Sequence, residues 1–297
     1  MKSTLLALLL AAAAIAGTAG AQAAPPSTDI FLAPLTIRGD EIVVGTAVNT
    51  TQRPGYDNQP AFLPDGSGFL FTSIRDDAQA DIWRYDLASR RSTRVTSTPE
   101  SEYSATPIAG GTAFSAVRVE RDSTQRLWRF PLSGGEPALV LEGTKPVGYH
   151  AWMGDSSVAV FVVGKSPTLQ VAALGQGSGT TYARDIGRGL ARVPGQRAVV
   201  FVQKRPDGDR LVELAFLPGE FRTRTLIRTL PNQEFFAFLP DGRLLSASTD
   251  GVLHAWNGEC ADRARWIRVG SLGNIRNVSR LAVSPDGKWL AVVAEGN

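Results

Sequence analysis

The sequence predicts an all-β protein, a six-bladed β-propeller whose blades are four-stranded antiparallel sheets. The first observation is a stretch, Gln59 to Thr98, in which Gly, Pro, Asp or Ser separates four short segments rich in aromatic and β-branched residues. Consecutive strands joined by tight turns produce this pattern. The second observation is that the stretch recurs along the chain in steps of 40 to 46 residues. A period of this length is typical of propeller blades.

The copy at 59–98 shows how one unit is built. Asp65-Gly66 separates two apolar runs, and glycine supplies the positive φ that a tight hairpin turn needs. Apolar segments that follow each turn are expected to be buried second strands: 69–71, 113–116, 158–162, 198–202, 244–247 and 289–293. Third strands are expected at 81–87, 126–130, 169–174, 210–216 and 252–256, and fourth strands at 93–98, 137–141, 180–185, 222–228 and 265–269. No segment has a sustained 3.6-residue period, so we expect very little helix.

The two ends of the chain predict how the ring closes. The last copy, 280–295, supplies only a first and a second strand. Residues 29–35 match the third-strand pattern of 81–87, and residues 41–49 have the pattern of a fourth strand. We therefore expect N-terminal strands at about 29–49 to pair with C-terminal strands at about 280–295, because a closed ring leaves no open sheet edge. A two-sheet sandwich would not account for the period.

Composition places the chain among ordinary globular proteins. It has 297 residues, of which 43% are hydrophobic and 20% charged. A formal charge of +3 gives no argument for binding nucleic acid or a membrane surface. Cys260 is the only cysteine, so no internal disulfide can form, and the fold must be stabilised by its core.

The N-terminus has the pattern of a secretory signal peptide, at residues 1–23. Lys2 gives a positive start, Leu5 to Ile15 form an apolar run, and Ala21-Gln22-Ala23 fits a cleavage site. The run is too short to span a bilayer. We therefore expect an exported protein in which residues 24–297 form one propeller domain and no segment stays inserted in the membrane.

Several repeat segments resemble a known family. Phe62-Leu-Pro-Asp-Gly66 and Val283-Ser-Pro-Asp-Gly-Lys-Trp-Leu290 are similar to the repeat of TolB-like (WD40-like) propellers. The resemblance is strongest at 59–98, 236–270 and 280–295, and it concerns the propeller part of that family only. It implies an exported, periplasmic propeller that binds a partner.

Ligand sites in propellers usually lie at the mouth of the central channel, which is built by the loops that enter each first strand. In the register above, these loops present an aromatic and basic rim, consisting of Tyr103, Tyr149, His150, Arg188, Phe235 and Arg280. Aromatic residues and arginine are the types that hot spots for protein binding favour. The alternative is that the rings pack between neighbouring blades.

A metal site is a second possibility on the same loops. Their oxygen ligands are Asp57, Asn58, Glu102, Glu234 and Asn277, and a hard cation such as calcium takes six to eight oxygens. These residues have no fixed local spacing, and the chain has two histidines, fewer than zinc sites commonly use. No Gly-x-Ser-x-Gly nucleophile elbow is present.

These observations predict a non-enzymatic, periplasmic, monomeric β-propeller that uses no cofactor. We expect it to bind a protein or peptide of the cell envelope through the mouth of its channel. The alternative is a hydrolase or lyase that uses a calcium-type divalent cation on a small molecule in the channel.

Overall fold

The computed structural model describes residues 26–75 and 78–296, so the predicted signal peptide at 1–23 lies outside the described residues. Within them the chain is built of strands, with one short 3₁₀ turn at Ala261–Arg263. The all-β prediction is confirmed. The described residues contain no helical segment that could span a lipid bilayer.

Four sheets have four antiparallel strands each, and they follow one another along the chain. The first contains β8 (Ser101–Pro107), β9 (Ala113–Val119), β10 (Gln125–Pro131) and β11 (Ala138–Leu139). The second contains β12 (Val147–Trp152), β13 (Ser157–Val162), β14 (Thr168–Ala173) and β15 (Thr180–Arg184). The third contains β16 (Ile186–Arg192), β17 (Ala198–Gln203), β18 (Arg210–Leu217) and β19 (Glu220–Arg228). The fourth contains β20 (Ala237–Phe238), β21 (Leu244–Ala247), β22 (Val252–Trp256) and β23 (Trp266–Ser271).

The remaining strands form one nine-stranded sheet. Part of it is a consecutive antiparallel set, β4 (Tyr56–Phe62), β5 (Gly68–Ile74), β6 (Ala80–Asp86) and β7 (Arg91–Arg94). The rest comes from both ends of the chain: β24 (Arg280–Val283), β25 (Trp289–Glu295), β1 (Thr28–Arg38), β2 (Glu41–Val44) and β3 (Val48–Asn49). The two parts are joined by a single parallel pair, Thr28 with Tyr56, while all other pairs are antiparallel.

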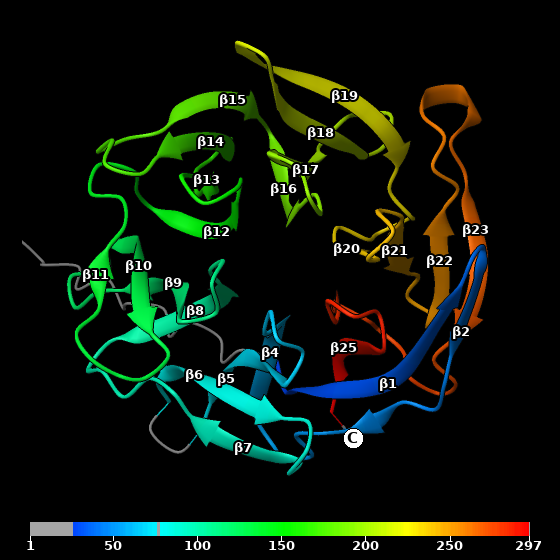
Figure 1. The fold of residues 1–297 in the computed structure, drawn as a ribbon, viewed down its shortest axis with the longest axis horizontal. Coiled ribbons are helices and arrows are strands. Elements are labelled where there is room, and N and C mark those ends of the chain that lie inside the picture. Colours follow the sequence, from blue (N-terminus) through cyan, green and yellow to red (C-terminus); the bar gives the residue numbers. More distant parts are fainter. Residues whose placement is uncertain (1–25, 76–77, 297) are drawn as a thin grey trace, which may run out of the picture.

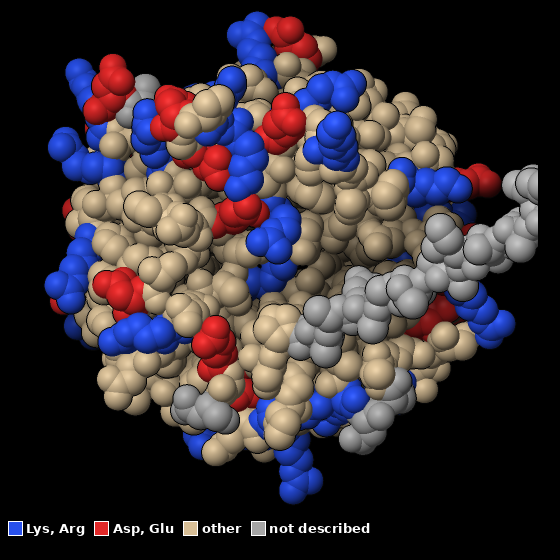
Figure 2. Space-filling view, turned by 180° about the vertical axis from the view of Figure 1, so that it is seen from behind, with Lys and Arg blue, Asp and Glu red and all other residues tan. Residues whose placement is uncertain are grey.

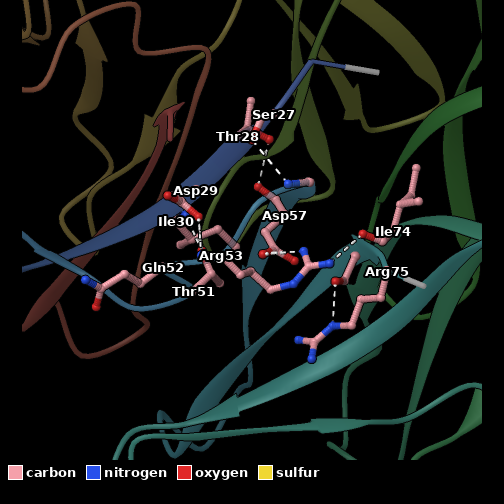
Figure 3. A network of polar contacts seen from close by, with 12 residues as sticks. Ser27, Thr28, Asp29, Ile30, Thr51, Gln52, Arg53, Asp57, Ile74 and Arg75 are labelled. Carbon is pink, nitrogen blue, oxygen red and sulfur yellow. Dashed lines mark hydrogen bonds and ion pairs between the residues drawn. The ribbon is translucent and has the colours of Figure 1, made fainter. Parts of the chain in front are cut away.

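Strand β1 pairs with β25 along seven residues, from Thr28 with Glu295 to Pro34 with Trp289. A polar network joins β1, β4 and β5 (Figure 3). Thr28 Oγ1 of β1 donates to Asp57 O of β4 over 3.0 Å. Arg53 Nη1 lies 3.0 Å from Asp57 Oδ2, and Arg53 Nη2 donates to Ile74 O of β5 over 2.8 Å. Asp57 is fully buried, so Arg53 neutralises a charge that would otherwise be costly in this position.

The sheets are arranged in a ring, with β4, β12, β16 and β20 toward the middle and β7, β11, β15, β19 and β23 outside (Figure 1). Hydrophobic clusters lie between neighbouring sets of strands. One contains Val200 of β17 and Trp256 of β22, and another, within the nine-stranded sheet, contains Ile30 of β1 and Phe71 of β5. The core is therefore divided among several such contacts, and the first strands border the middle of the ring (Figure 1).

The structure corrects two expectations about local structure. The predicted fourth strand at 41–49 is divided into β2 and β3, with unpaired residues between them. The site residues predicted on entering loops lie mostly in strands. Asp57, Asn58, Glu102, Tyr103, Tyr149, His150, Arg188 and Arg280 all lie in first strands, whereas Glu234, Phe235 and Asn277 lie in loops. This matters because neighbouring residues of a strand point to opposite faces.

Candidate functional site at the channel mouth

A cavity of about 160 Å³ lies where the first strands meet, and we call it the channel cavity. Each copy of the repeat has a small residue in its first strand: Ala61, Thr106, Ala151, Ala191, Ala237 and Ala282. Six residues that line the cavity lie two positions before these: Gln59, Ser104, Tyr149, Gly189, Phe235 and Arg280. They come from β4, β8, β12, β16, the loop before β20, and β24. The repeat therefore brings residues from the whole chain to one point.

Irregular first strands direct these side chains. The pairing register shifts within β4, β8, β12 and β16, which marks bulges that re-aim side chains. Gln59 and Ser104 have positive φ angles of 60° and 56°. Gln59 Oε1 accepts hydrogen bonds from Thr72 Oγ1 and Ser104 N, each 2.7 Å long, and so links two neighbouring sheets at the cavity.

Four of the predicted rim residues converge into one cluster, which we call the channel mouth: Tyr149, Arg188, Phe235 and Arg280. Arg280 Nη2 donates to Tyr149 Oη over 3.1 Å, and its guanidinium carbon lies 4.1 Å from the Phe235 ring centre. The Arg188 guanidinium carbon lies 5.6 Å from the same ring centre. These are cation–π contacts, and they leave aromatic rings and cations beside the cavity.

Of the two arginines at the channel mouth, Arg188 has a carboxylate partner and Arg280 has none among the described residues. Glu234 Oε2 accepts a hydrogen bond from Arg188 N over 2.9 Å and lies 3.3 Å from Arg188 Nε, and Glu234 Oε1 pairs with Lys204. Burial opposes ionisation of Glu234, but the bonds from Lys204 and Arg188 outweigh it and lower the pKa of that carboxyl. Lys204 also pairs with Asp209 at 2.7 Å. Arg280, by contrast, pairs with no carboxylate among residues 26–75 and 78–296.

Close backbone packing holds the Phe235 loop in place. At Gly189 an added Cβ would lie 1.8 Å from Glu234 O, closer than any real contact. Only glycine allows the loop to lie against β16 in this way. Gly189 therefore determines where Phe235 stands beside the cavity.

His150 differs from the predicted rim. It follows Tyr149 in β12, so it points to the other side of the strand and is 6% exposed. Its Nε2 shares a 2.6 Å hydrogen bond with Ser115 Oγ, which also accepts from Trp152 Nε1 over 2.9 Å. Burial lowers the pKa of His150 to about 3, so the ring is neutral at physiological pH. It cannot supply a rim cation.

Tyr103 and Tyr56 lie near this cluster without lining the cavity. Burial raises the pKa of Tyr103, and it raises the pKa of Tyr56 to about 12 although Arg280 and Arg188 act in the opposite direction. Both phenols therefore stay neutral hydrogen-bond donors. Tyr56 was not among the predicted site residues, and its place at the start of β4, directly before Asp57, is the signal that could have indicated it.

The candidate metal ligands are separate and mostly occupied by other contacts. Asp57 is paired with Arg53, Glu102 with Arg118 at 3.2 Å, and Glu234 with Lys204 and Arg188. Asn58 donates to Thr28 Oγ1, and Asn277 is exposed with a φ of 53°. No group of three or more His, Cys, Asp or Glu suited to a metal ion exists in the described parts of the chain.

A larger hollow of about 820 Å³ adjoins the channel mouth, and we call it the side groove. Arg188 and Phe235 line both the side groove and the channel cavity. The other walls include Lys204, Asp209 and Asn277. On the face of the molecule shown in Figure 2, basic side chains gather near the middle with acidic ones beside them.

Comparison with known proteins supports the fold. No family model and no curated protein matches the chain in sequence. Among solved structures, one assigned to TolB from Agrobacterium tumefaciens has a TM-score of 0.65 at 16% identity, covering 91% of this chain and 98% of that one. TolB from Acinetobacter baumannii has a TM-score of 0.57 at 13% identity, covering 91% of this chain and 65% of that one. A gluconolactonase from Xanthomonas campestris has a TM-score of 0.62 at 11% identity, covering 92% and 98%. At these identities the likeness concerns the fold alone, and the fold is a β-propeller, which TolB and the gluconolactonase share.

Proposed function

We propose that this protein is an exported, non-enzymatic propeller that binds a protein or peptide of the cell envelope at its channel mouth. The observation that carries the proposal is the convergence of Tyr149, Phe235 and Arg280 from distant parts of the chain on one cavity. Exposed or half-buried aromatic rings held by arginine are rigid contact surfaces, and such residues dominate protein-binding hot spots.

The proposal includes a ring of six blades closed by the two ends of the chain. In this interpretation the nine-stranded sheet is two blades, β4 to β7 and β24-β25-β1-β2, joined by the single parallel pair. Six hydrophobic clusters, each between neighbouring sets of strands, support this division. Closure would fix the six lining residues relative to one another, which a preorganised binding site requires.

The separation of the acidic residues favours binding over metal-dependent catalysis. A calcium-type site needs several carboxylate or carbonyl oxygens directed at one ion. Here Asp57, Glu102 and Glu234 each face a basic partner instead. The fold is shared with a gluconolactonase, but a fold does not carry an activity without its site.

The experiment is affinity capture from a solubilised cell-envelope fraction at high salt. The tagged wild-type protein is expected to capture a saturable partner, and a Tyr149→Ala/Phe235→Ala variant is expected to capture at least about tenfold less, as for loss of two hot-spot residues. The matched control is Tyr182→Ala/Phe221→Ala, which alters an aromatic pair on the outer strands β15 and β19 with ring centres 4.6 Å apart. Equal capture by the channel variant and the wild type would show that the proposed face is wrong.

Export to the periplasm and a monomeric state are parts of the same proposal. Mass spectrometry of the processed protein is expected to give a mature chain that begins near Ala24, because of the cleavage pattern at Ala21 to Ala23. Light scattering of that chain should give the mass of one copy. A retained N-terminus would contradict cleavage and export, and a stable dimer would contradict the monomeric state.

A further inference from the structure

Arg280 stands out as a cation without a counter-charge. Its side chain is half-buried in the wall of the channel cavity, and no carboxylate in the described parts of the chain pairs with it. Its contacts are neutral: the Tyr149 hydroxyl at 3.1 Å and the ring of Phe235 at 4.1 Å. A partly desolvated guanidinium that lacks an anion leaves hydrogen-bonding capacity unused, and an anionic guest would satisfy it.

The cavity wall contains a further polar atom that lacks a protein partner. Ser104 lines the channel cavity, and its Oγ is buried and makes no hydrogen bond within the described residues. Buried polar atoms are almost always satisfied by protein, water or ligand. Together with Arg280, this hydroxyl indicates a cavity suited to a polar, negatively charged group.

We propose that the channel cavity is a carboxylate-binding site in which Arg280 is the anchor, and that the ligand is an extended peptide carrying that carboxylate. This inference rests on the proposed function and deepens it by naming the chemical class of the ligand. The guanidinium of arginine matches a carboxylate in a two-pronged geometry, which a lysine ammonium does not. The carboxylate can come from a C-terminus or from an Asp or Glu side chain.

Size and charge restrict the guest to a single carboxylate. A cavity of about 160 Å³ has room for about five water molecules, enough for a carboxylate with the carbon that bears it and some solvent. Arg188 is already paired with Glu234, so Arg280 is left as the one cation to balance a guest. A doubly charged phosphate would exceed the single positive charge that Arg280 supplies.

The side groove gives the rest of the peptide a path. It shares Arg188 and Phe235 with the channel cavity, so a chain whose carboxylate reaches Arg280 can continue along the groove. Thr249 and Asn277 line that groove and present polar side chains to a passing backbone. In this proposal the channel cavity binds the carboxylate of the peptide, and the side groove binds the extended backbone that carries it.

The test uses capped tripeptides and the nitrogen-15 resonance of the Arg280 Nε–H group in the full-length mature protein. One pair of probes is acetyl-Gly-Gly-Phe with a free C-terminus and its amidated form. The other pair is acetyl-Gly-Asp-Gly-amide and acetyl-Gly-Asn-Gly-amide. At least one acid is expected to shift the Arg280 resonance saturably and to bind at least tenfold more tightly than its amide counterpart. Arg280→Gln should abolish that difference, Arg280→Lys should reduce it, and the exposed control Arg222→Gln, whose side chain is 66% exposed, should keep it.

Each outcome decides the inference. A preference in the first pair assigns a C-terminal carboxylate, and one in the second pair assigns a side-chain carboxylate. Equal binding of acids and amides by the wild-type protein would overturn the carboxylate site, whether or not the variants fold. If envelope capture then still fails in Tyr149→Ala/Phe235→Ala but persists in Arg280→Gln, the proposed function stands and this inference falls. If the acids bind at Arg280 while capture is insensitive to Tyr149 and Phe235, the inference stands and the proposed function falls.

Discussion

Arg280 donates a 3.1 Å hydrogen bond to the hydroxyl of Tyr149, although the two residues are 131 positions apart in the chain. Arg280 belongs to β24 and Tyr149 to β12, so the bond links two first strands that belong to separate sheets. The Tyr149 ring also packs edge-on against Phe161, with ring centres 5.6 Å apart. The hydrogen bond between Arg280 and Tyr149 therefore fixes the orientation of the guanidinium relative to the aromatic rings of the channel mouth.

Removing only the Tyr149 hydroxyl is expected to weaken the site without dismantling it. Tyr149→Phe keeps the ring beneath Arg280 but loses one hydrogen bond, a change of about 1 kcal/mol, or roughly fivefold in partner affinity. Tyr149→Ala should cost considerably more, because the ring is lost as well. Titration calorimetry with the captured partner measures both. Identical affinities for Tyr149→Phe and Tyr149→Ala would contradict a role for the ring.

Gly189→Ala is expected to disturb binding through the backbone. The new Cβ would lie 1.8 Å from Glu234 O, so the loop that carries Phe235 must move away from β16. We expect a cooperative fold with at least about tenfold weaker partner capture, because Phe235 would leave its place at the cavity. Gly195→Ala is a control for glycine replacement, since nothing lies within 4 Å of a Cβ there; its φ of 68° will cost some stability but should leave capture intact. Undiminished capture by Gly189→Ala would show that Phe235 is not required.

His150 should make stability depend on acid pH. Its pKa is 6.5 in the unfolded chain and about 3 in the folded protein because burial disfavours the charged ring. Between these values the unfolded chain binds a proton that the folded protein does not. Stability should therefore be unaffected above pH 6.5 and fall as the pH drops from 6.5 toward 3, by at most about 1.4 kcal/mol per pH unit. Urea unfolding at several pH values should show a shallower decline for His150→Gln, and an unchanged decline would mean that His150 is not the group responsible.

Arg53 should be important for stability because it neutralises a buried carboxylate. Asp57 is fully buried and Arg53 contacts it at 3.0 Å (Figure 3). Arg53→Gln leaves that charge without its ionic partner, which is expected to cost about 3 kcal/mol in urea unfolding. Arg53→Gln/Asp57→Asn should recover part of this loss. Arg222→Gln, in an exposed pair with Glu220, should change stability by less than about 0.5 kcal/mol. A loss for Arg53→Gln no larger than for Arg222→Gln would contradict this account of the network.

The sequence was informative where a local pattern decides the structure. Gly66, Gly242 and Gly287 have the positive φ that the Pro-Asp-Gly turns require, and the buried second strands begin within about a residue of their predicted positions. Outer strands were less predictable. An exposed edge strand is not specified by a strict apolar pattern, so the sequence predicts its ends poorly. The strand expected at 137–141 is only Ala138–Leu139 in the structure.

The site was only partly predictable, for a geometrical reason. The repeat register indicated which positions reach the channel, and Tyr149, Phe235 and Arg280 occupy them. Because segment 148–150 is strand and not loop, Tyr149 and His150 face opposite ways, which the loop interpretation could not anticipate. The unpaired state of Arg280 depends on how distant strands meet, and no local spacing encodes that.

Site-specific photo-crosslinking can show directly whether the channel mouth is the face that binds a partner. A benzophenone amino acid placed at Phe235 of the tagged protein is irradiated in the intact cell envelope, and the same residue is placed at Phe221 on the outer strand β19 for comparison. We expect a discrete crosslinked partner from position 235, which disappears when Tyr149→Ala is added, and none from position 221. A partner crosslinked from position 221 but not from position 235 would place binding on the outer strands and rule out the channel mouth as the binding face.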